Sequence, residues 1–334
     1  MLTRFLYIAY YIKKLDKTQF FKFVNHVVAT CHIQKWKLYF DMISSSIKYN
    51  ISLNEYFLFH FYNMNHEQRM SYAGTGFMYE YQLKMNPKSK RNVLINKLEF
   101  LKVYKDFVRH EFASLTEIAE NPKIAEHLLS NTSEKIVLKS STGQCGRGIE
   151  VRNSTDFTAD TLVTRLKELD NDFVEEYVSQ HPVLNELSPS GLNTIRIITQ
   201  VNKSGAVEIL GARLRITVNS AIDNMAAGNI AAFVNPQTGV VEGPGVYSDI
   251  TKPEEFVHPI TGIQIVGFQI PLWKETIEMV TAAALVDTGN RSIGWDVAIT
   301  SAGPELIEGN HDWCKLLWQL PARKGLKQDL IVYL

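Results

Sequence analysis

A glycine-rich loop with a lysine before it is the first part of the sequence that could do chemistry. Residues 140–148 contain three glycines, and Lys139 directly precedes them. Glycines let backbone N–H groups turn inward and approach an anion closely, and a nearby ammonium group adds positive charge. Because strands rather than a helix are predicted after the loop, it is neither a Walker A loop nor a dinucleotide-binding fingerprint. It predicts a phosphate site, with an ordinary hairpin loop as the alternative.

Two carboxylates and an amide near the end of the chain could hold a metal ion. Asp296 lies within the apolar residues 293–299, and Glu308 and Asn310 lie within residues 305–310. If these segments pair, Asp296 comes opposite Glu308, and Asn310 shares the face of Glu308. Oxygen ligands without histidine or thiolate suit Mg²⁺, and carboxylates on buried strands need a compensating partner. The alternative is a solvated pair of strand carboxylates.

Three arginines on two predicted neighbouring strands could hold an anion. Arg196 lies in residues 194–201, and Arg213 and Arg215 lie in residues 207–216. Arginine binds phosphate or carboxylate through two parallel hydrogen bonds. Surface salt bridges are the alternative, but together with a phosphate loop and a metal pair the arginines predict a cationic site for a reacting anion.

The second part of the chain must supply the strands that position these residues. From about residue 134, β-rich segments alternate with turns and two amphipathic helical patterns. The predicted strands are residues 135–139, 149–152 and 173–178, the hairpin of 194–201 with 207–216, the pair 229–234 and 239–243, and the hairpin of 293–299 with 305–310. Helices are predicted at residues 156–170 and 271–285, the second opening with Pro271.

The first part of the chain is aromatic, poor in glycine and predicted to be helical. Apolar residues recur at helical spacing, and Ser52 with Glu55 three residues later forms a capping-box pattern. Residues 1–92 are therefore interpreted as a helical region. Its first 14 residues could also make shallow contact with a membrane interface, although packing against the rest of the protein is the favoured interpretation.

Composition excludes several classes of protein. The 334 residues, 45% of them hydrophobic, provide for about two domains. Thirty-five basic and 35 acidic residues give no formal net charge, which argues against binding to nucleic acid through bulk electrostatics. Three widely spaced cysteines indicate a reducing cytoplasm. No apolar run approaches the length of a transmembrane helix, and the first residues are not typical of a signal peptide.

The motifs together resemble the ATP-grasp superfamily, and within it the sugar-transfer-associated ATP-grasp family found with polysaccharide-building glycosyltransferases. The resemblance covers about residues 93–315, at positions 96–100, 139–148, 174–182, 193–196, 214–215, 223–228, 258–262, 294–300 and 306–310. It implies an α+β ATP-grasp fold of two subdomains that clamp ATP, after a helical N-terminal region of residues 1–92. The ATP-grasp domain would span residues 93–334, with a phosphate-lid subdomain at about 97–180 and a metal and substrate subdomain at about 181–334.

The resemblance also implies roles for individual residues. The ATP phosphates would be bound by Lys97, Lys139 and the lid residues Ser141, Gly143, Gly146 and Gly148. Adenine and ribose would be bound by Glu175, Glu176, Tyr177 and Val178. One or two Mg²⁺ ions would be held by Asp296, Glu308 and Asn310. Catalysis would depend on Arg196, Arg215 and Lys139, and the substrate side would be lined by Arg213, Asp223, Asn224 and Gly228. Cys145 stands in the lid, but this chemistry needs no thiol nucleophile.

The implied activity is that of an ATP-dependent carboxylate–amine ligase that works through an acyl phosphate. By analogy with the family, the expected substrates are an amino acid or other amine and a carboxylated sugar of a surface polysaccharide. A sugar kinase on the same fold and a nucleotide-binding scaffold for glycosyltransferases are the alternatives. The expected location is the cytoplasm, and both association with glycosyltransferases and contact with the inner membrane face stay open.

Overall fold

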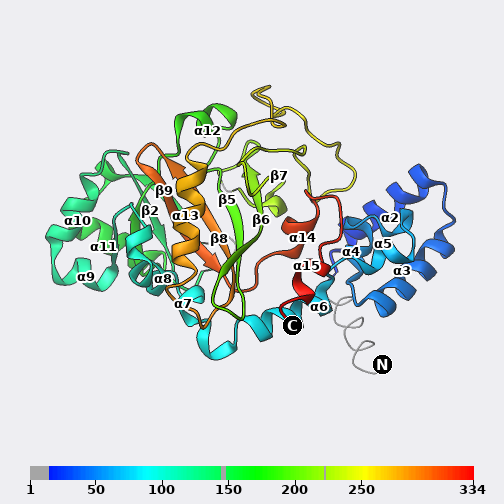
Figure 1. The fold of residues 1–334 in the computed structure, drawn as a ribbon. Coiled ribbons are helices and arrows are strands. Elements are labelled where there is room, and N and C mark those ends of the chain that lie inside the picture. The colour runs from blue at the N-terminus through cyan, green and yellow to red at the C-terminus, as the bar shows by residue number, and fades with distance from the viewer. Residues whose placement is uncertain (1–14, 144–147, 222) are drawn as a thin grey trace.

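Two antiparallel sheets and a helical N-terminal region make up the fold of this computed structural model (Figure 1). The structure describes residues 15–143, 148–221 and 223–334. Figure 1 shows the first helices at one end of the molecule, the smaller sheet with its helices at the other end, and the larger sheet between them. Among the described helices, none combines the length and the apolar character needed to pass through a lipid bilayer.

The predicted helical region is confirmed from residue 17 onward. Its helices are α2 (Lys17–Cys31), α3 (Lys35–Tyr49), α4 (Leu53–Leu58), α5 (His66–Met70), α6 (Thr75–Met85), α7 (Asn92–Ile95) and α8 (Lys97–Val103). The predicted capping box is present, because Ser52 and Glu55 exchange hydrogen bonds at the start of α4. A cluster of buried aromatic side chains, including Phe23, Phe57 and Phe61, holds α2 to α4 together.

The smaller sheet carries the predicted phosphate loop. It has the order β1–β4–β2–β3, formed by β1 (Phe112–Ser114), β2 (Lys135–Lys139), β3 (Glu150–Asn153) and β4 (Phe173–Glu176). The helices α9 (Leu115–Glu120), α10 (Pro122–Leu129) and α11 (Ala159–Glu168) supply its core with residues such as Leu128 and Leu162. The predicted strand 173–178 and helix 156–170 are both present, but each is shorter than expected.

The larger sheet carries the predicted arginines and carboxylates. It has the order β7–β6–β5–β8–β9, formed by β5 (Ile195–Val201), β6 (Val207–Ile216), β7 (Ile230–Val234), β8 (Ser292–Thr300) and β9 (Gly303–Asn310). Both predicted hairpins, β5 with β6 and β8 with β9, are confirmed. One face of the sheet packs on α8 and α13 (Trp273–Ala283) through residues such as Ile197 and Trp295.

Two boundary predictions for this part of the chain are wrong. Residues 239–243 form no regular strand, because Val240 and Val241 make only isolated bridges, to Gln269 and Val234. Pro271 does not open a helix: α13 begins at Trp273, after Leu272 in the left-handed conformation. The left-handed residue changes the chain direction before the helix, which a proline alone does not indicate.

The opposite face of the larger sheet is covered by the end of the chain. The helices α14 (Lys315–Gln319) and α15 (Gln328–Ile331) lie there. The helix α12 (Pro182–Leu187) lies beyond one end of the strands, at the top of the view in Figure 1. Trp313 packs directly on Gly294 in β8, where an added Cβ would lie 2.6 Å from the Cβ of Trp313. A side chain at position 294 would therefore displace this cover.

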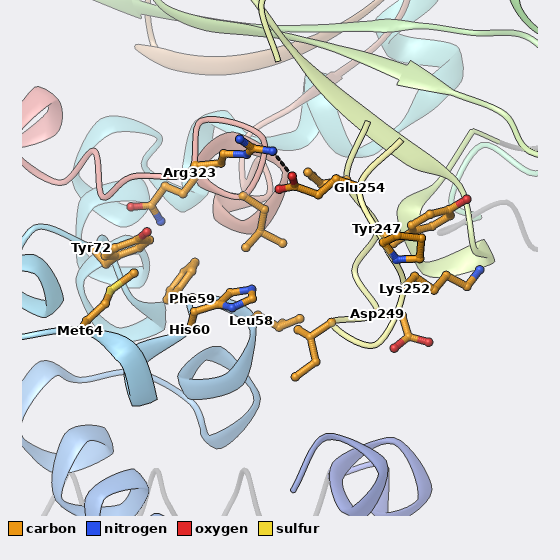
Figure 2. A pocket seen from close by; sticks show the side chains of 15 residues that line it. Leu58, Phe59, His60, Met64, Tyr72, Tyr247, Asp249, Lys252, Glu254 and Arg323 are labelled. Atoms are coloured by element: carbon orange, nitrogen blue, oxygen red, sulfur yellow. Dashed lines mark hydrogen bonds and ion pairs between the residues drawn. The ribbon is translucent and has the colours of Figure 1, made fainter. Parts of the chain in front are cut away.

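A cavity of about 330 Å³ lies between the N-terminal helices and the segment after β7 (Figure 2). Apolar side chains such as Phe59 and Tyr72 form one wall, and Tyr247 stands on the other. An ion pair between Arg323 and Glu254 closes one side. None of the described lining residues is a predicted ATP or Mg²⁺ ligand, so this cavity is separate from the predicted site.

Candidate active site

A row of charged side chains crosses the larger sheet at its centre. Asp296 in β8 pairs in register with Arg196 in β5 on one side and with Glu308 in β9 on the other. Arg196 donates to both carboxylate oxygens of Asp296, with 2.9 Å between Nη2 and Oδ2. Arg215 in β6 donates to the same Oδ2 at 2.6 Å. The predicted arginine site and the predicted carboxylate pair therefore form one cluster.

The neighbouring charges shift the pKa values of Asp296 and Glu308 in opposite directions. Burial would raise the pKa of Asp296, but Arg196 and Arg215 outweigh that effect and hold this pKa well below its usual range. The pKa of Glu308 is raised, first by burial and then by the negative charge of Asp296. A second carboxylate beside an ionised one creates excess negative charge, which a divalent cation would neutralise.

The oxygen donors at this point fit Mg²⁺. Asn310 donates from Nδ2 to Glu308 Oε1 and to the carbonyl of Gly294, both at 3.2 Å, which holds its amide beside the Glu308 carboxylate. Glu308 and Asn310 are half-buried, whereas Asp296 is buried and already hydrogen-bonded to arginine. Within the described ranges, no group of three or more His, Cys, Asp or Glu side chains is arranged for a metal. An amide oxygen, waters and phosphate oxygens would thus have to complete a Mg²⁺ shell.

Lys97 connects the glycine-rich loop to the carboxylate row. It is the first residue of α8, its backbone N–H donates to the Ser141 carbonyl at 2.9 Å, and its Nζ donates to the Gly143 carbonyl. Burial lowers the pKa of Lys97, the charge of Glu308 opposes this effect, and the charge of Lys139 adds to it. Lys97 therefore lies within electrostatic reach of both the other predicted phosphate lysine and the predicted metal site.

The two ends of the glycine-rich loop are fastened by residues that precede β4. Ser141 donates to the Asp172 carboxylate from its backbone N–H at 2.6 Å and from Oγ at 2.5 Å. At the other end, Asn171 donates to the carbonyl of Gly148, whose φ of +74° favours glycine. Gly146 and Cys145 lie outside the described residues, between these two anchored ends.

A series of largely buried charges of alternating sign connects the smaller sheet to the larger sheet. Lys139 at the end of β2 pairs with Glu175 in β4, and Glu175 Oε2 lies 3.7 Å from Nε2 of His110. The Nδ1 of His110 lies 2.7 Å from Glu305 in β9, which also accepts the backbone N–H groups of Arg109 and His110. Burial opposes the charges, but Lys139 and His110 lower the pKa of Glu175 to about 2. Alternating charges therefore hold the smaller sheet against the larger one.

The predicted adenine-binding residues span the end of β4, and the chain leaves the smaller sheet after Glu176. Glu176 ends β4 and accepts the backbone N–H of Glu111 at 3.0 Å. The ring of Tyr177 lies under the Lys135 ammonium, 5.4 Å from its centroid, and Val178 is buried. These residues form one segment, with Glu175 as the member that contacts a predicted phosphate lysine.

The predicted substrate-side residues have different positions. Asp223 joins the charged row, because Arg215 Nη2 lies 2.6 Å from its Oδ1. Asn224 caps a short 3₁₀ helix, and Gly228 ends that helix with φ of +91°. Arg213 shares the sheet face but is not brought to the carboxylates: it donates to the Trp318 carbonyl and its guanidinium lies over the ring of Phe233.

Five residues of this site were missed by the sequence reasoning. They are His110, Asn171, Asp172, Thr194 and Glu305, of which Thr194 donates to Asp223. The polar run 170–172 before a predicted strand was a usable signal for the two loop anchors. His110 and Glu305 are 195 residues apart, and although Glu305 begins the predicted strand 305–310, nothing in the sequence marks His110 as its partner. No local signal could have paired them.

The comparison with protein families finds a match over most of the chain. A family model described as sugar-transfer associated ATP-grasp matches residues 77–331. No curated protein sequence matches the chain.

Several solved structures are similar in fold. One is a biotin carboxylase–β-γ-ATP complex from Campylobacter jejuni, with 12% identity, a TM-score of 0.45, and 72% of this chain and 46% of that chain covered. Another is D-alanyl-alanine synthetase A from Vibrio cholerae, with 13% identity, a TM-score of 0.38, and coverage of 65% and 55%. A third is a RimK domain ATP-grasp protein from Sphaerobacter thermophilus, with 12% identity, a TM-score of 0.39, and 72% of this chain and 68% of that chain covered. The chain spans about half the length of the first two proteins.

The buried position of His110 predicts a specific pH dependence of stability. Burial lowers the pKa of His110, but Glu175 and Glu305 outweigh that effect and raise it to about 9 from an ordinary 6.5. A raised pKa in the folded state means that the stabilisation is complete below the unfolded pKa and is lost as pH rises through about 9. Replacing His110→Gln should therefore lower the free energy of unfolding by about 2 kcal/mol at neutral pH and by much less near pH 10.

Urea denaturation of both proteins across this pH range measures the effect. His127→Gln, a change at an exposed histidine in α10, is the matched control and should leave the pH profile unchanged. A constant difference between His110→Gln and the unmodified protein at every pH would contradict the ionised state of His110.

Proposed function

The chain belongs to the sugar-transfer-associated ATP-grasp family, and on that premise we propose that it is an ATP-dependent carboxylate–amine ligase. The observation that carries the proposal is the convergence of three kinds of groups in one place. Lys97 lies within electrostatic reach of Lys139 and of Glu308, and Glu308 opposes Asp296, which two arginines hold. Paired lysines, oxygen ligands and arginines are the groups that phosphoryl transfer requires.

In this proposal ATP binds between the two sheets. Lys97 and Lys139 bind the phosphates, and Ser141, Gly143, Gly146 and Gly148 belong to the loop that closes over them. The segment from Glu175 to Val178 binds adenine and ribose. Lys139 contacts Glu175 in the present structure, so an incoming phosphate would compete with that carboxylate for the ammonium group.

In this proposal Mg²⁺ binds beside Glu308 and Asn310, and Asp296 is a third oxygen ligand that would share its carboxylate with Arg196 and Arg215. When bound, one or two such ions neutralise the charge of the phosphate oxygens and orient them. Arg196 and Arg215 are held by Asp296, and in this proposal their remaining N–H groups stabilise the negative charge of the transferred phosphoryl group. Asp223 holds Arg215 from the other side.

The proposed reaction has two steps. A carboxylate oxygen of the first substrate attacks the γ-phosphorus of ATP, so that a C–O–P acyl phosphate forms and ADP leaves. The amine nitrogen then attacks the carbonyl carbon, a C–N bond forms, inorganic phosphate leaves, and the nitrogen loses a proton. The enzyme positions the reactants, neutralises charge and excludes water, so it needs no side-chain nucleophile.

The substrates we propose are a carboxylated sugar and an amino acid or another amine, joined during surface polysaccharide synthesis. The family description associates the chain with sugar transfer, and a hexuronic acid is a sugar with the required carboxylate. We place this activity in the cytoplasm, where ATP is available, and propose glycosyltransferases as partners. A sugar kinase is the second candidate, because the same phosphate and Mg²⁺ residues would serve it.

The products formed from ATP distinguish a ligase from a kinase. Incubation with Mg-ATP, pooled amino acids and hexuronic acid sugars should release ADP and inorganic phosphate in equal amounts, and only when both substrate pools are present. Coupled enzymatic assays measure both products. Equal amounts are expected because the acyl phosphate loses its phosphate when the amine attacks.

Other product patterns would contradict this proposal in different ways. ADP without inorganic phosphate would identify a kinase, since the phosphoryl group would stay on the sugar. If Asp296→Asn left the cellular polysaccharide unchanged while deletion of the protein abolished it, the chain would act as a scaffold.

Lys139→Ala should abolish the thermal stabilisation by Mg-ATP. At about 100 times its dissociation constant, a ligand stabilises a protein by about 2.7 kcal/mol, and loss of the phosphate contact should remove most of this increment. Differential scanning fluorimetry with and without Mg-ATP measures it within each variant, which separates binding from any loss of intrinsic stability. The control is Lys123→Ala, at an exposed lysine of α10 in the same subdomain. An unchanged increment would remove Lys139 from the ATP site.

Glu308→Gln should lower turnover by at least about a hundredfold and raise the Mg²⁺ concentration required for half of the remaining activity. The physical reason is that the neutral amide is a weaker Mg²⁺ ligand than the carboxylate. A Mg²⁺ titration of ADP release measures both effects, with Glu278→Gln on the exposed side of α13 as the control. Normal activity at limiting Mg²⁺ would show that Glu308 is not a metal ligand.

A further inference from the structure

Helix α3 has a buried face and, opposite it, an exposed apolar stripe. Leu38, Met42 and Ser45 recur at helical spacing and face the core of the N-terminal region. Trp36 and Phe40, with Ile43 completing the same spacing, form the exposed stripe, which we call the outer stripe. An offset of two residues turns the helix by about 200°, so the outer stripe lies opposite the core.

The outer stripe is unusually exposed for large apolar side chains. Trp36 is 66% exposed, Phe40 is 72% exposed and Ile43 is 47% exposed. Contiguous exposed apolar side chains on one helix mark a contact surface, whereas single exposed ones need no explanation. The other four of the five tryptophans, Trp273, Trp295, Trp313 and Trp318, are at most 7% exposed.

Positive charge surrounds this stripe. Residues 17–49 contain five lysines and one aspartate, a difference of four positive charges. Three of the lysines, Lys35, Lys37 and Lys48, are exposed on α3 itself. The aspartate, Asp41, is held by two hydrogen bonds from Arg69 at 2.7 and 2.8 Å, so its negative charge is largely compensated. The helix therefore presents tryptophan and phenylalanine within a basic surface.

From these observations we infer that the outer stripe of α3 docks on an anionic lipid surface. Tryptophan is favoured at the level of lipid headgroups, and an amphipathic helix with basic flanks binds there through buried apolar area and attraction to anionic lipids. Near the membrane each lysine adds about 1 kcal/mol to that attraction. A protein partner would require complementary acidic and apolar groups, whereas an anionic bilayer supplies both along its whole surface.

The position of α3 suits such contact. Figure 1 shows α2 and α3 at one end of the molecule and α9 and α10, the helices beside the smaller sheet, at the opposite end. A bilayer that contacts α3 would thus leave the sheets with the proposed ATP site open to solution. This inference does not depend on the proposed ligase activity, since it uses no residue of that site.

Vesicle flotation of the full chain tests the inference. The protein should float with vesicles of phosphatidylcholine and phosphatidylglycerol and stay below vesicles of phosphatidylcholine alone. Because Trp36 is the exposed tryptophan, its emission should shift to shorter wavelength on binding and be quenched by lipids with brominated acyl chains. Trp36→Phe should keep flotation and lose both the emission shift and the quenching.

Substitutions within and outside the stripe locate the contact. The double variant Trp36→Ser with Phe40→Ser should bind these vesicles at least about tenfold more weakly. Phe256→Ser, at an aromatic residue that is 55% exposed outside the helical region, should bind normally. The thermal unfolding midpoint and far-UV circular dichroism should stay unchanged in every variant, which shows that each one is folded.

Three results would overturn the inference. Absence of flotation with anionic vesicles would exclude a lipid surface as the occupant. Undiminished binding of the double variant would assign the contact to another surface. A stable dimer in solution that is lost with Trp36→Ser and Phe40→Ser would show that a second copy of the chain covers the stripe.

Discussion

The ion pairs of Asp296 with two arginines are the interaction on which the arrangement of the larger sheet depends. A buried carboxylate is costly unless it is paired and hydrogen-bonded, and here Arg196 and Arg215 supply both conditions from neighbouring strands. A shift of one residue in the register of β5 or β8 would move these charges to opposite faces. The charged row thus fixes the register, and the register in turn brings Glu308 opposite Asp296.

The apolar flanks of the charged row explain why the end of the chain folds back over the larger sheet. The flanks of this face are apolar, and Trp313 and Trp318 cover them beside the guanidinium of Arg213. Arg213 has lost its solvation: burial lowers its pKa to about 9, and its hydrogen bonds go to backbone carbonyls, including that of Trp318. Its role here is therefore to hold the C-terminal segment, while Arg215, two residues further on, faces the carboxylates.

The features that the sequence predicts correctly are those that depend only on residues near one another in the chain or on the pairing of two consecutive strands. Strand alternation and hairpin pairing correctly placed Asp296 opposite Glu308, and the capping box at Ser52 needs only four residues. The separate roles of Arg213 and Arg215 were not predictable, because alternation gives both the same face and only the position of Trp318 distinguishes them. The link from Lys139 through Glu175 and His110 was equally hidden, since it depends on how two sheets pack.

The helical N-terminal region is fastened to the ATP-grasp body by specific polar contacts. Gln319 in α14 accepts the backbone N–H of Ala73 at 2.9 Å and donates to the carbonyl of the same residue at 3.0 Å. Lys22 in α2 pairs with Asp249 at 2.5 Å. Apolar side chains of α14 also pack against the aromatic core of the helical region. Because these contacts attach the helical region to the rest of the protein, the fold would set the orientation of the proposed ATP site relative to any surface that α3 contacts.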